Sequence, residues 1–425
     1  MITKLKHLYN SEGINQTVIT GFSNYTSAIL AAFAIIFISR NLGPTIFGEF
    51  SAAFSLATVL AKLNDAGITI ATQKFASKST NKREVKSIVL YGYRLKMLLS
   101  SILMVLVLPL SGYLTHIFSF SHPAIVPISI SLGLFLVYND QLIASLLATH
   151  SFLKAAYANI LQAGLKLIAA IVITFKLDNA LLPLLISYLL APGIPVIFKS
   201  LFEPAWFKKT KPIKISSKNK QKFLSLAKHS ALLVFVLGIL DSVGVLFVKA
   251  YLSSYEAGLL GGISRVAMLF IMIGVSISQV LNNRVSRYTD KHNLKIYLNK
   301  ILYLSGASIM LFLLTLPLLP LIIRYTIGTE YLVALVPMIL LLASVFVYIL
   351  SVPFAALFYS FEKNSYFSIS GFIQLTSIIL GNLLLVPSFG ITGSALAQLF
   401  SRSILLVFTL FFAYRAYREK FGYEK

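Results

Sequence analysis

The sequence of 425 residues contains no cysteine, and only 12% of its residues are charged. Without cysteine, neither a disulfide nor a thiolate metal site can form. Soluble domains carry about 25% charged residues, so the low charge argues against a large soluble catalytic domain. Acidic residues are especially few, with 14 Asp and Glu against 37 Lys and Arg and a net charge of +23.

Motifs for nucleotide, zinc and sugar-nucleotide chemistry are absent as well. The chain has no G-x-x-x-x-G-K-[ST], no H-E-x-x-H and no D-x-D sequence. An ATPase, a zinc protease and a loop-based glycosyltransferase would each need one of these motifs. The longest predicted loop, 203–222, is too short to hold a separate catalytic domain.

Hydrophobic residues make up 57% of the chain, and a membrane-spanning helix needs about 20 of them in a row. The apolar runs, broken at charges and helix breakers, predict an all-α polytopic membrane protein. The first run begins after two lysines, lacks a small-residue cleavage site and carries Asn24, so we expect a retained helix rather than a signal peptide. The predicted spans, about twelve, are 14–39, 46–68, 87–113, 123–149, 155–175, 180–202, 223–248, 256–281, 298–323, 332–361, 364–387 and 391–414.

The basic residues favour one orientation. With the amino terminus in the cytoplasm, the even-numbered loops and the tail collect most of the lysine and arginine. The opposite side receives little beyond Arg40, Lys176, Lys249 and Arg324. The positive-inside rule then places both termini in the cytoplasm. The basic run 203–222 is therefore interpreted as an orienting loop without a nucleic-acid partner, and a secondary role in holding anionic lipid headgroups stays open.

The two halves of the chain match each other at an offset of 210 residues. Leu42 and Gly48 fall on Leu252 and Gly258, and the span boundaries coincide. Because six spans is an even number, both halves keep the same orientation. We therefore predict two pseudo-symmetric six-helix lobes around a central cavity, which is a transporter architecture. The predicted boundaries are an amino-terminal lobe at 1–202, a basic cytoplasmic linker at 203–222, a carboxy-terminal lobe at 223–414 and a cytoplasmic tail at 415–425.

Three segments resemble motifs of a known family. The sequence N-L-G-P-T-I-F-G-E-F at 41–50 resembles the N-L-G-P-x-x-F-G-x-[FY] signature of polysaccharide transporters in the multidrug/oligosaccharidyl-lipid/polysaccharide exporter superfamily. A degenerate copy, L-S-S-Y-E-A-G, stands at 252–258. The sequence P-S-F-G-I-T-G-S-A at 387–395 resembles the family's P-x-x-G-x-x-G-[AS]-A segment before the last span. The best match within the family is the Wzx-type flippase of O-antigen or capsule repeat units.

This resemblance implies a transporter without a cofactor, and not an enzyme. The implied activity belongs to polysaccharide and lipopolysaccharide biosynthesis. It is the flipping of an undecaprenyl-pyrophosphate-linked oligosaccharide from the cytoplasmic to the periplasmic leaflet of a bacterial inner membrane by alternating access, with a glycan polymerase as a candidate partner. Gly43, Pro44 and Gly48 of the motif would form a tight turn between helices, so we do not expect them to contact substrate.

Ionisable side chains at bilayer depth are costly unless they face a bundle interior or water. For Lys62, an intrahelical pair with Asp65 or a side chain that reaches the cytoplasmic interface is the competing interpretation. Arg94 and Lys96 are expected near the cytoplasmic end of their span, where long cations reach the interface. The candidate substrate-binding residues of a cationic cavity are Lys62, Lys166, Arg265 and Arg402.

Two carboxylates, Asp140 and Asp241, lie well inside the apolar runs. Each could form an H⁺ or Na⁺ coupling site or neutralise a nearby lysine or arginine. Neutral polar residues on the predicted helices are candidates for the cavity lining, with packing between helices as the alternative. These neutral candidates are Asn24, Ser55, Thr58, Gln162 and Gln398.

The excess of cations favours an anionic cargo, because arginine and lysine bind phosphate well. A multidrug exporter of the same superfamily usually carries organic cations and would be expected to use carboxylates. An interior-negative potential of about 100 mV contributes roughly 2.3 kcal/mol per charge, so it favours outward movement of a pyrophosphate diester by about 4 to 5 kcal/mol. The multidrug exporter remains the main alternative. A membrane glycan polymerase or ligase is a lesser one, because it would be expected to need a large periplasmic loop.

Overall fold

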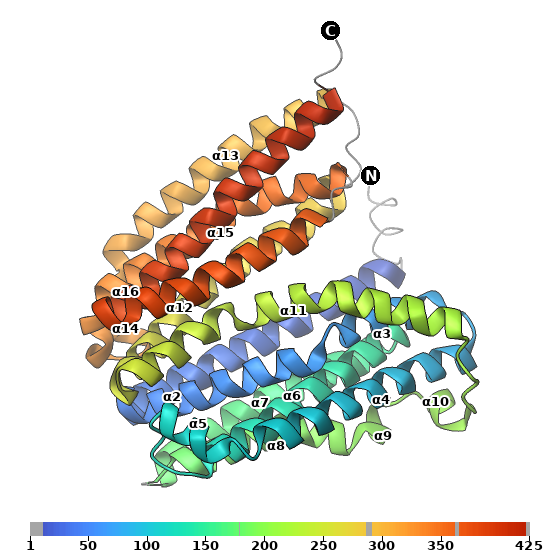
Figure 1. Cartoon of the computed structure of the whole chain (residues 1–425), viewed down its shortest axis with the longest axis horizontal. Coiled ribbons are helices and arrows are strands. Elements are labelled where there is room, and N and C mark those ends of the chain that lie inside the picture. Colours follow the sequence, from blue (N-terminus) through green and yellow to red (C-terminus); the bar gives the residue numbers. More distant parts are fainter. Residues whose placement is uncertain (1–11, 178, 286–290, 362–364, 422–425) are drawn as a thin grey trace. The chain divides into compact units, whose positions relative to one another are not determined.

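The computed structural model describes residues 12–177, 179–285, 291–361 and 365–421. Every regular element in these ranges is a helix, as Figure 1 shows. The predicted all-α fold is therefore confirmed. The helices of the first half are α2 (Glu12–Asp65), α3 (Ile68–Lys78), α4 (Lys82–Val107), α5 (Ser111–Ile117), α6 (Ile125–Ala148), α7 (Phe152–Lys176), α8 (Leu181–Ile197), α9 (Lys199–Phe202) and α10 (Ala205–Lys209). Those of the second half are α11 (Ser217–Tyr251), α12 (Ser254–Val285), α13 (Lys291–Thr315), η1 (Leu316–Leu318), α14 (Leu319–Thr326), η2 (Thr329–Ala334), α15 (Leu335–Ser360) and α16 (Ser365–Phe421).

Nine helices in the described residues are long and apolar enough to cross a membrane. Two of them, Ile19–Asp65 and Ser368–Glu419, are 47 and 52 residues long, about twice what one span requires. Counting each of these as two spans and adding the shorter apolar helix Leu181–Ile197 gives the predicted twelve. Many exposed side chains on these helices are large and apolar, among them Val105, Leu302 and Val407, as expected for surfaces that face lipid.

Each of the two longest helices changes direction at one glycine. Gly43 inside α2 has φ 69° and ψ 171°, and Gly390 inside α16 has φ 56° and ψ −138°. Positive φ values of this kind are costly for residues that carry a Cβ. Pro44 follows Gly43 directly, and its fixed φ suits the first turn of the next helical segment. The glycine of the N-L-G-P sequence therefore makes the turn that separates the first two spans.

The chain forms two compact units. Unit 1 comprises residues 1–38 and 53–235, and unit 2 comprises residues 39–52 and 236–425. The segment around the N-L-G-P sequence thus belongs to unit 2, although the spans on either side of it belong to unit 1. Within unit 1, α6 packs against α3, α4, α7 and α8.

The basic segment 203–222 packs against the rest of unit 1 through aromatic residues. Phe207 is buried and shares a hydrophobic cluster with Phe223 and Val85. The backbone N–H of Ile213 donates to the Ser87 hydroxyl at 2.8 Å. The buried Phe207 side chain therefore holds this lysine-rich segment against α4.

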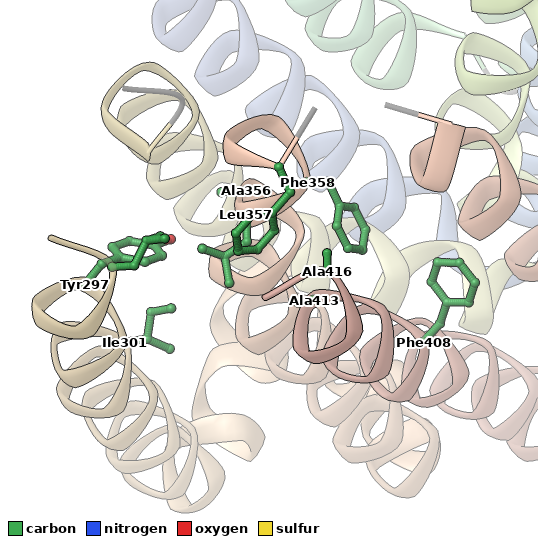
Figure 2. Packing of buried hydrophobic residues seen from close by; sticks show 10 residues of the cluster. Tyr297, Ile301, Ala356, Leu357, Phe358, Phe408, Ala413 and Ala416 are labelled. Atoms are coloured by element: carbon green, nitrogen blue, oxygen red, sulfur yellow. The ribbon is translucent and has the colours of Figure 1, made fainter. Parts of the chain in front are cut away.

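In unit 2, α15 packs against α12, α13 and α16. Figure 2 shows the buried cluster that holds α13, α15 and α16 together, which includes Tyr297, Leu357, Phe358 and Phe408. The Tyr297 hydroxyl donates to the Pro353 carbonyl at 2.9 Å. This bond satisfies a polar atom inside an otherwise apolar cluster.

The repeated motif glycines Gly48 and Gly258 lie against each other's helices within unit 2. A Cβ on Gly48 would lie 1.7 Å from the Ser254 carbonyl oxygen, and a Cβ on Gly258 would lie 1.7 Å from the Pro44 carbonyl oxygen. No side chain fits at such distances without a shift of the backbone. Gly43 makes the turn, whereas Gly48 and Gly258 permit close packing of two helices that the 210-residue offset relates.

Candidate functional site

A cavity of about 230 Å³ lies within unit 1. It opens between residues of α2, α3, α6 and the part of α11 that belongs to this unit. Most of the surface of its wall is apolar, and the polar groups lie where α2 and α3 meet α6. The lining residues are Lys62, Asp65, Thr69, Ile70, Gln73, Asp140, Ile143, Ala144, Leu147 and Val234.

Lys62 and Asp140 form an ion pair at the edge of this cavity. The Lys62 ammonium donates to the Asp140 carboxylate at 3.1 Å, and the two side chains are 27% and 41% exposed. The pair joins α2 to α6 across 78 residues of sequence. Both side chains are in contact with solvent, so a ligand that enters the cavity can reach either charge.

A second ion pair lies deeper in the same unit. The Lys96 ammonium lies 2.7 Å from the Asp65 carboxylate, with side chains 0% and 4% exposed. Lys96 also donates to the Thr69 hydroxyl at 2.6 Å and to the Val137 carbonyl at 3.1 Å, and Thr69 in turn donates to Asp65. The three donor positions of this ammonium therefore all have acceptors, as burial requires.

Two sequence-based interpretations change here. Lys96 does not reach the interface, because its side chain points from α4 into the centre of unit 1, where it is completely buried. Lys62 does not pair with Asp65 along its own helix, since Asp65 takes Lys96 as its partner and Lys62 takes Asp140. Lys62 and Asp65 therefore each pair with a residue on a neighbouring helix, and not with each other at i, i+3.

Neutral hydrogen bonds support this polar centre. The buried Gln141 amide donates to the Thr72 hydroxyl at 3.0 Å, and the buried Asn64 amide donates to the Ser100 hydroxyl at 2.7 Å. The first bond joins α6 to α3, and the second joins α2 to α4, as the Lys96–Asp65 pair also does. In the part of the chain that the structure describes, no group of three His, Cys, Asp or Glu could hold a metal ion.

Lys62 and Asp65 at the end of α2 and Thr69 at the start of α3 lie on either side of a break between these two helices. Ala66 and Gly67 have φ values of 43° and 73° and separate the two helices. A Cβ on Gly67 would lie 2.3 Å from the Ala227 carbonyl oxygen of α11, so only glycine allows this approach. Despite the break, Thr69 still reaches Asp65, which keeps both residues at one end of the cavity.

The other predicted cations have aromatic or sulfur neighbours. The Lys166 ammonium lies 5.7 Å from the centre of the Tyr188 ring in unit 1. In unit 2, the buried Arg402 guanidinium lies 5.5 Å from the centre of the Tyr348 ring, and the half-buried Arg265 donates to the Met268 sulfur at 3.4 Å. Such cation–π contacts compensate a cation for part of its lost hydration.

The predicted neutral lining residues differ in their surroundings. Asn159, which the sequence analysis does not single out, donates to Asn24 at 3.2 Å and accepts from Gln162 at 3.2 Å, and so joins α2 and α7. Ser55 is buried, and the Thr58 hydroxyl donates to the Phe54 carbonyl of its own helix at 2.9 Å. Gln398 is half-buried on α16. The side chain of Asp241 lies outside the described residues.

Unit 2 contains a buried ion pair that sequence reasoning misses. The Lys249 ammonium lies 2.6 Å from the Glu49 carboxylate, and the side chains are 1% and 7% exposed. The Ser254 hydroxyl also donates to Glu49, at 2.6 Å. The only sequence feature that points to this pair is the position of Glu49 inside the N-L-G-P-x-x-F-G-x-[FY] match. Lys249 has no such feature, because it lies at the end of a predicted span, where lysines are common.

The fold is that of the MOP superfamily transporters. An inward-facing multidrug resistance MATE family transporter aligns with a TM-score of 0.76 and 13% identity, covering 94% of this chain and 96% of the other. The lipid II flippase MurJ in an inward closed conformation aligns with a TM-score of 0.72 and 16% identity, covering 95% and 90%. A MOP superfamily transporter from Pyrococcus furiosus, described as having a binding pocket of reverse polarity, aligns with a TM-score of 0.57 and 13% identity, covering 95% and 94%.

The chain belongs to the polysaccharide biosynthesis protein family, whose model matches residues 14–281. This match, together with the apolar helices and the fold, identifies a multi-pass membrane protein, and the structural neighbours named above are a multidrug transporter, a lipid II flippase and a further transporter. Among curated proteins, none matches the chain.

Proposed function

We propose that this protein flips an undecaprenyl-pyrophosphate-linked oligosaccharide, such as an O-antigen or capsule repeat unit, from the cytoplasmic to the periplasmic leaflet of a bacterial inner membrane. Both termini would lie in the cytoplasm, as the positive-inside rule predicts. Alternating access would expose the same binding residues first to one side and then to the other. Membership of the polysaccharide biosynthesis family supports the oligosaccharide part of the proposal.

The observation that carries the proposal is the position of Lys62 on the wall of the unit 1 cavity. Its ammonium is partly exposed there, and the Thr69 hydroxyl and the Gln73 amide line the same space. A cation beside hydroxyl and amide groups suits a phosphate group next to a sugar. Lys166 in unit 1 and Arg265 and Arg402 in unit 2 are further candidates for contact with the substrate.

The same cavity is poorly suited to an organic cation. Both of its carboxylates already have lysine partners, because Asp140 pairs with Lys62 and Asp65 pairs with Lys96. A cationic drug would have to displace a lysine from either carboxylate. This arrangement favours an anionic cargo over multidrug export, although the MATE transporters share the fold.

The membrane potential would supply the driving force. With the interior negative, an anion of two charges gains about 4 to 5 kcal/mol at roughly 100 mV when it moves outward. Coupling to H⁺ or Na⁺ through Asp140 or Asp241 is the additional step that we consider. At Asp140 such a cation would bind only after Lys62 has left the carboxylate, because the two side chains form an ion pair.

The test is flipping of a lipid-linked oligosaccharide in proteoliposomes with an imposed potential. Wild-type protein is expected to flip the lipid faster when the interior is negative, and Lys62→Gln is expected to lower the rate at least tenfold. Lys176→Gln is the matched control, because it removes the same charge from an exposed position at the end of α7. Equal rates for wild type and Lys62→Gln would refute the role of Lys62, and drug efflux without lipid flipping would refute the proposed function.

A further inference from the structure

We propose that Asp140 determines the specificity of the unit 1 cavity for phosphate groups that carry more than one negative charge. In this interpretation the Asp140 carboxylate occupies the anion-binding position at the Lys62 ammonium, and an incoming ligand must displace it. The inference rests on the proposed function, because it concerns how the same cavity recognises the pyrophosphate group. It adds a reason why an abundant phospholipid with a single negative charge would not be transported.

The first step of the argument is that this ion pair can open. Asp140 and Lys62 are 41% and 27% exposed, and the hydrogen bond between them is 3.1 Å long. The neighbouring Lys96 is fully buried and has three acceptors. Separation of the exposed pair costs little because water replaces each partner, whereas separation of the buried pair leaves charges without solvent.

The second step concerns the balance of charge around Lys62. The described charged groups at this site are Lys62 and Lys96 against Asp65 and Asp140, which sum to zero. A neutral site does not attract anions over a distance. A ligand therefore binds at Lys62 only if its own interaction with the ammonium exceeds that of the carboxylate it displaces.

The third step compares ligands. A phosphodiester with one charge exchanges with a carboxylate of one charge, so the exchange brings no electrostatic gain. A pyrophosphate diester has about two charges and oxygen atoms on two phosphorus centres, so it can contact Lys62 with one phosphate and the Gln73 amide with the other. Charge-assisted hydrogen bonds of this kind are about twice as strong as neutral ones. Asp140 thus raises the threshold for binding and favours the pyrophosphate.

The experiment is calorimetric titration of the purified full-length protein in detergent with two probes, inorganic pyrophosphate and dimethyl phosphate. Wild-type protein is expected to bind pyrophosphate and to show little affinity for dimethyl phosphate. In Asp140→Asn, which keeps the shape of the side chain and removes its charge, the affinity for dimethyl phosphate is expected to rise about tenfold, equivalent to 1.4 kcal/mol. The affinity for pyrophosphate is expected to rise less, so the ratio of the two affinities falls.

Two further variants separate specificity from a general effect of charge. Glu203→Gln removes one carboxylate from unit 1 away from the residues that line the cavity, and it is expected to leave both affinities unchanged. The double variant Lys62→Gln with Asp140→Asn is expected to lack the increased affinity for dimethyl phosphate, because the cation that binds it is gone. Asp140→Ser serves as a second charge-removing variant if Asp140→Asn does not fold.

The outcomes distinguish this inference from the proposed function. If wild type binds pyrophosphate and the ratio of affinities stays the same in Asp140→Asn, Asp140 has no role in specificity while the flippase proposal stands. If Glu203→Gln changes the ratio as much as Asp140→Asn does, net charge rather than the ion pair is responsible. If no variant binds pyrophosphate, both proposals fail.

Discussion

Two residues within one turn of α2, Lys62 and Asp65, form ion pairs in different surroundings. Lys62 reaches Asp140 on α6 at the cavity wall, while Asp65 reaches Lys96 on α4 in the centre of unit 1. The first pair is partly exposed, and the second is almost completely buried. Their chemistry is the same, so the difference in exposure decides which charge a ligand can reach.

The buried pair has the features of a structural element. A desolvated ammonium needs every donor satisfied, and Lys96 achieves this with Asp65, Thr69 and a backbone carbonyl. The Glu49–Lys249 pair of unit 2 is buried in the same way, and Ser254 forms a hydrogen bond with each of its members. Two buried pairs therefore fix helices inside their units, and the exposed pair is available for exchange.

The largest effect is expected from Lys96→Ala. The change leaves the Asp65 carboxylate buried without its cation, and removal of one partner of a buried pair costs about 3–5 kcal/mol. Thermal unfolding in detergent should therefore show a strongly destabilised protein or none that folds. The paired change of Lys96→Met with Asp65→Leu should recover much of this loss. If Lys96→Ala were as stable as wild type, the structural role of the Lys96–Asp65 pair would be contradicted.

A somewhat smaller loss is expected from Lys249→Ala in unit 2. Glu49 would lose its cation but keep the hydrogen bond from Ser254, so we expect a cost of about 3 kcal/mol, at the lower end for a broken buried pair. The same unfolding measurement checks it. Adding Ser254→Ala should deepen the loss, whereas Lys176→Ala at an exposed helix end should have almost no effect.

Lys62→Ala should separate stability from transport. The pair with Asp140 is partly exposed, so its loss should cost no more than about 1 kcal/mol of stability. Flipping of lipid-linked oligosaccharide should nevertheless fall sharply. Exchange of the two residues, Lys62→Asp with Asp140→Lys, should keep the stability near that of wild type. A stability loss as large as that of Lys96→Ala would erase the distinction between the pairs.

The smallest effect is expected in the salt dependence. At about 1 M salt the Debye length falls to roughly 3 Å, so the small cost of Lys62→Ala should vanish. The cost of Lys96→Ala should hardly change, because ions do not enter the buried site. Unfolding of both variants and of wild type at low and high salt provides the comparison.

Much of the fold could be predicted from apolar runs and a few glycines. The twelve spans follow from hydrophobicity, and the turn at Gly43 follows from the N-L-G-P sequence, because both are local properties of the chain. The predicted third span, 87–113, nevertheless ends at Val107, and a short helix begins at Ser111. Pro109 between them lacks the backbone N–H that a further turn of α4 would need. At the other end, α4 begins at Lys82, five residues before the predicted boundary, where the Asn81 side chain caps it by accepting from the Arg83 N–H.

The site was harder to predict, because its members come from different helices. Lys62 and Asp140 could be chosen as ionisable residues at bilayer depth, and both lie on the cavity wall. Their pairing could not be predicted, since it depends on how α2 packs against α6. Lys96, like Arg94, was predicted at the interface because it lies near the cytoplasmic end of its span, and only the packing of α4 shows it to be buried.

The sequence by itself determined that this chain is a polytopic membrane protein with a basic side and about twelve spans, because hydrophobicity and charge act residue by residue. Only the tertiary structure decided which lysine meets which carboxylate and which pair stays open to water. The physical reason is that the cost of a charge depends on its surroundings: the same ammonium is a structural partner when buried at Lys96 and a candidate ligand for phosphate when it lines a cavity at Lys62.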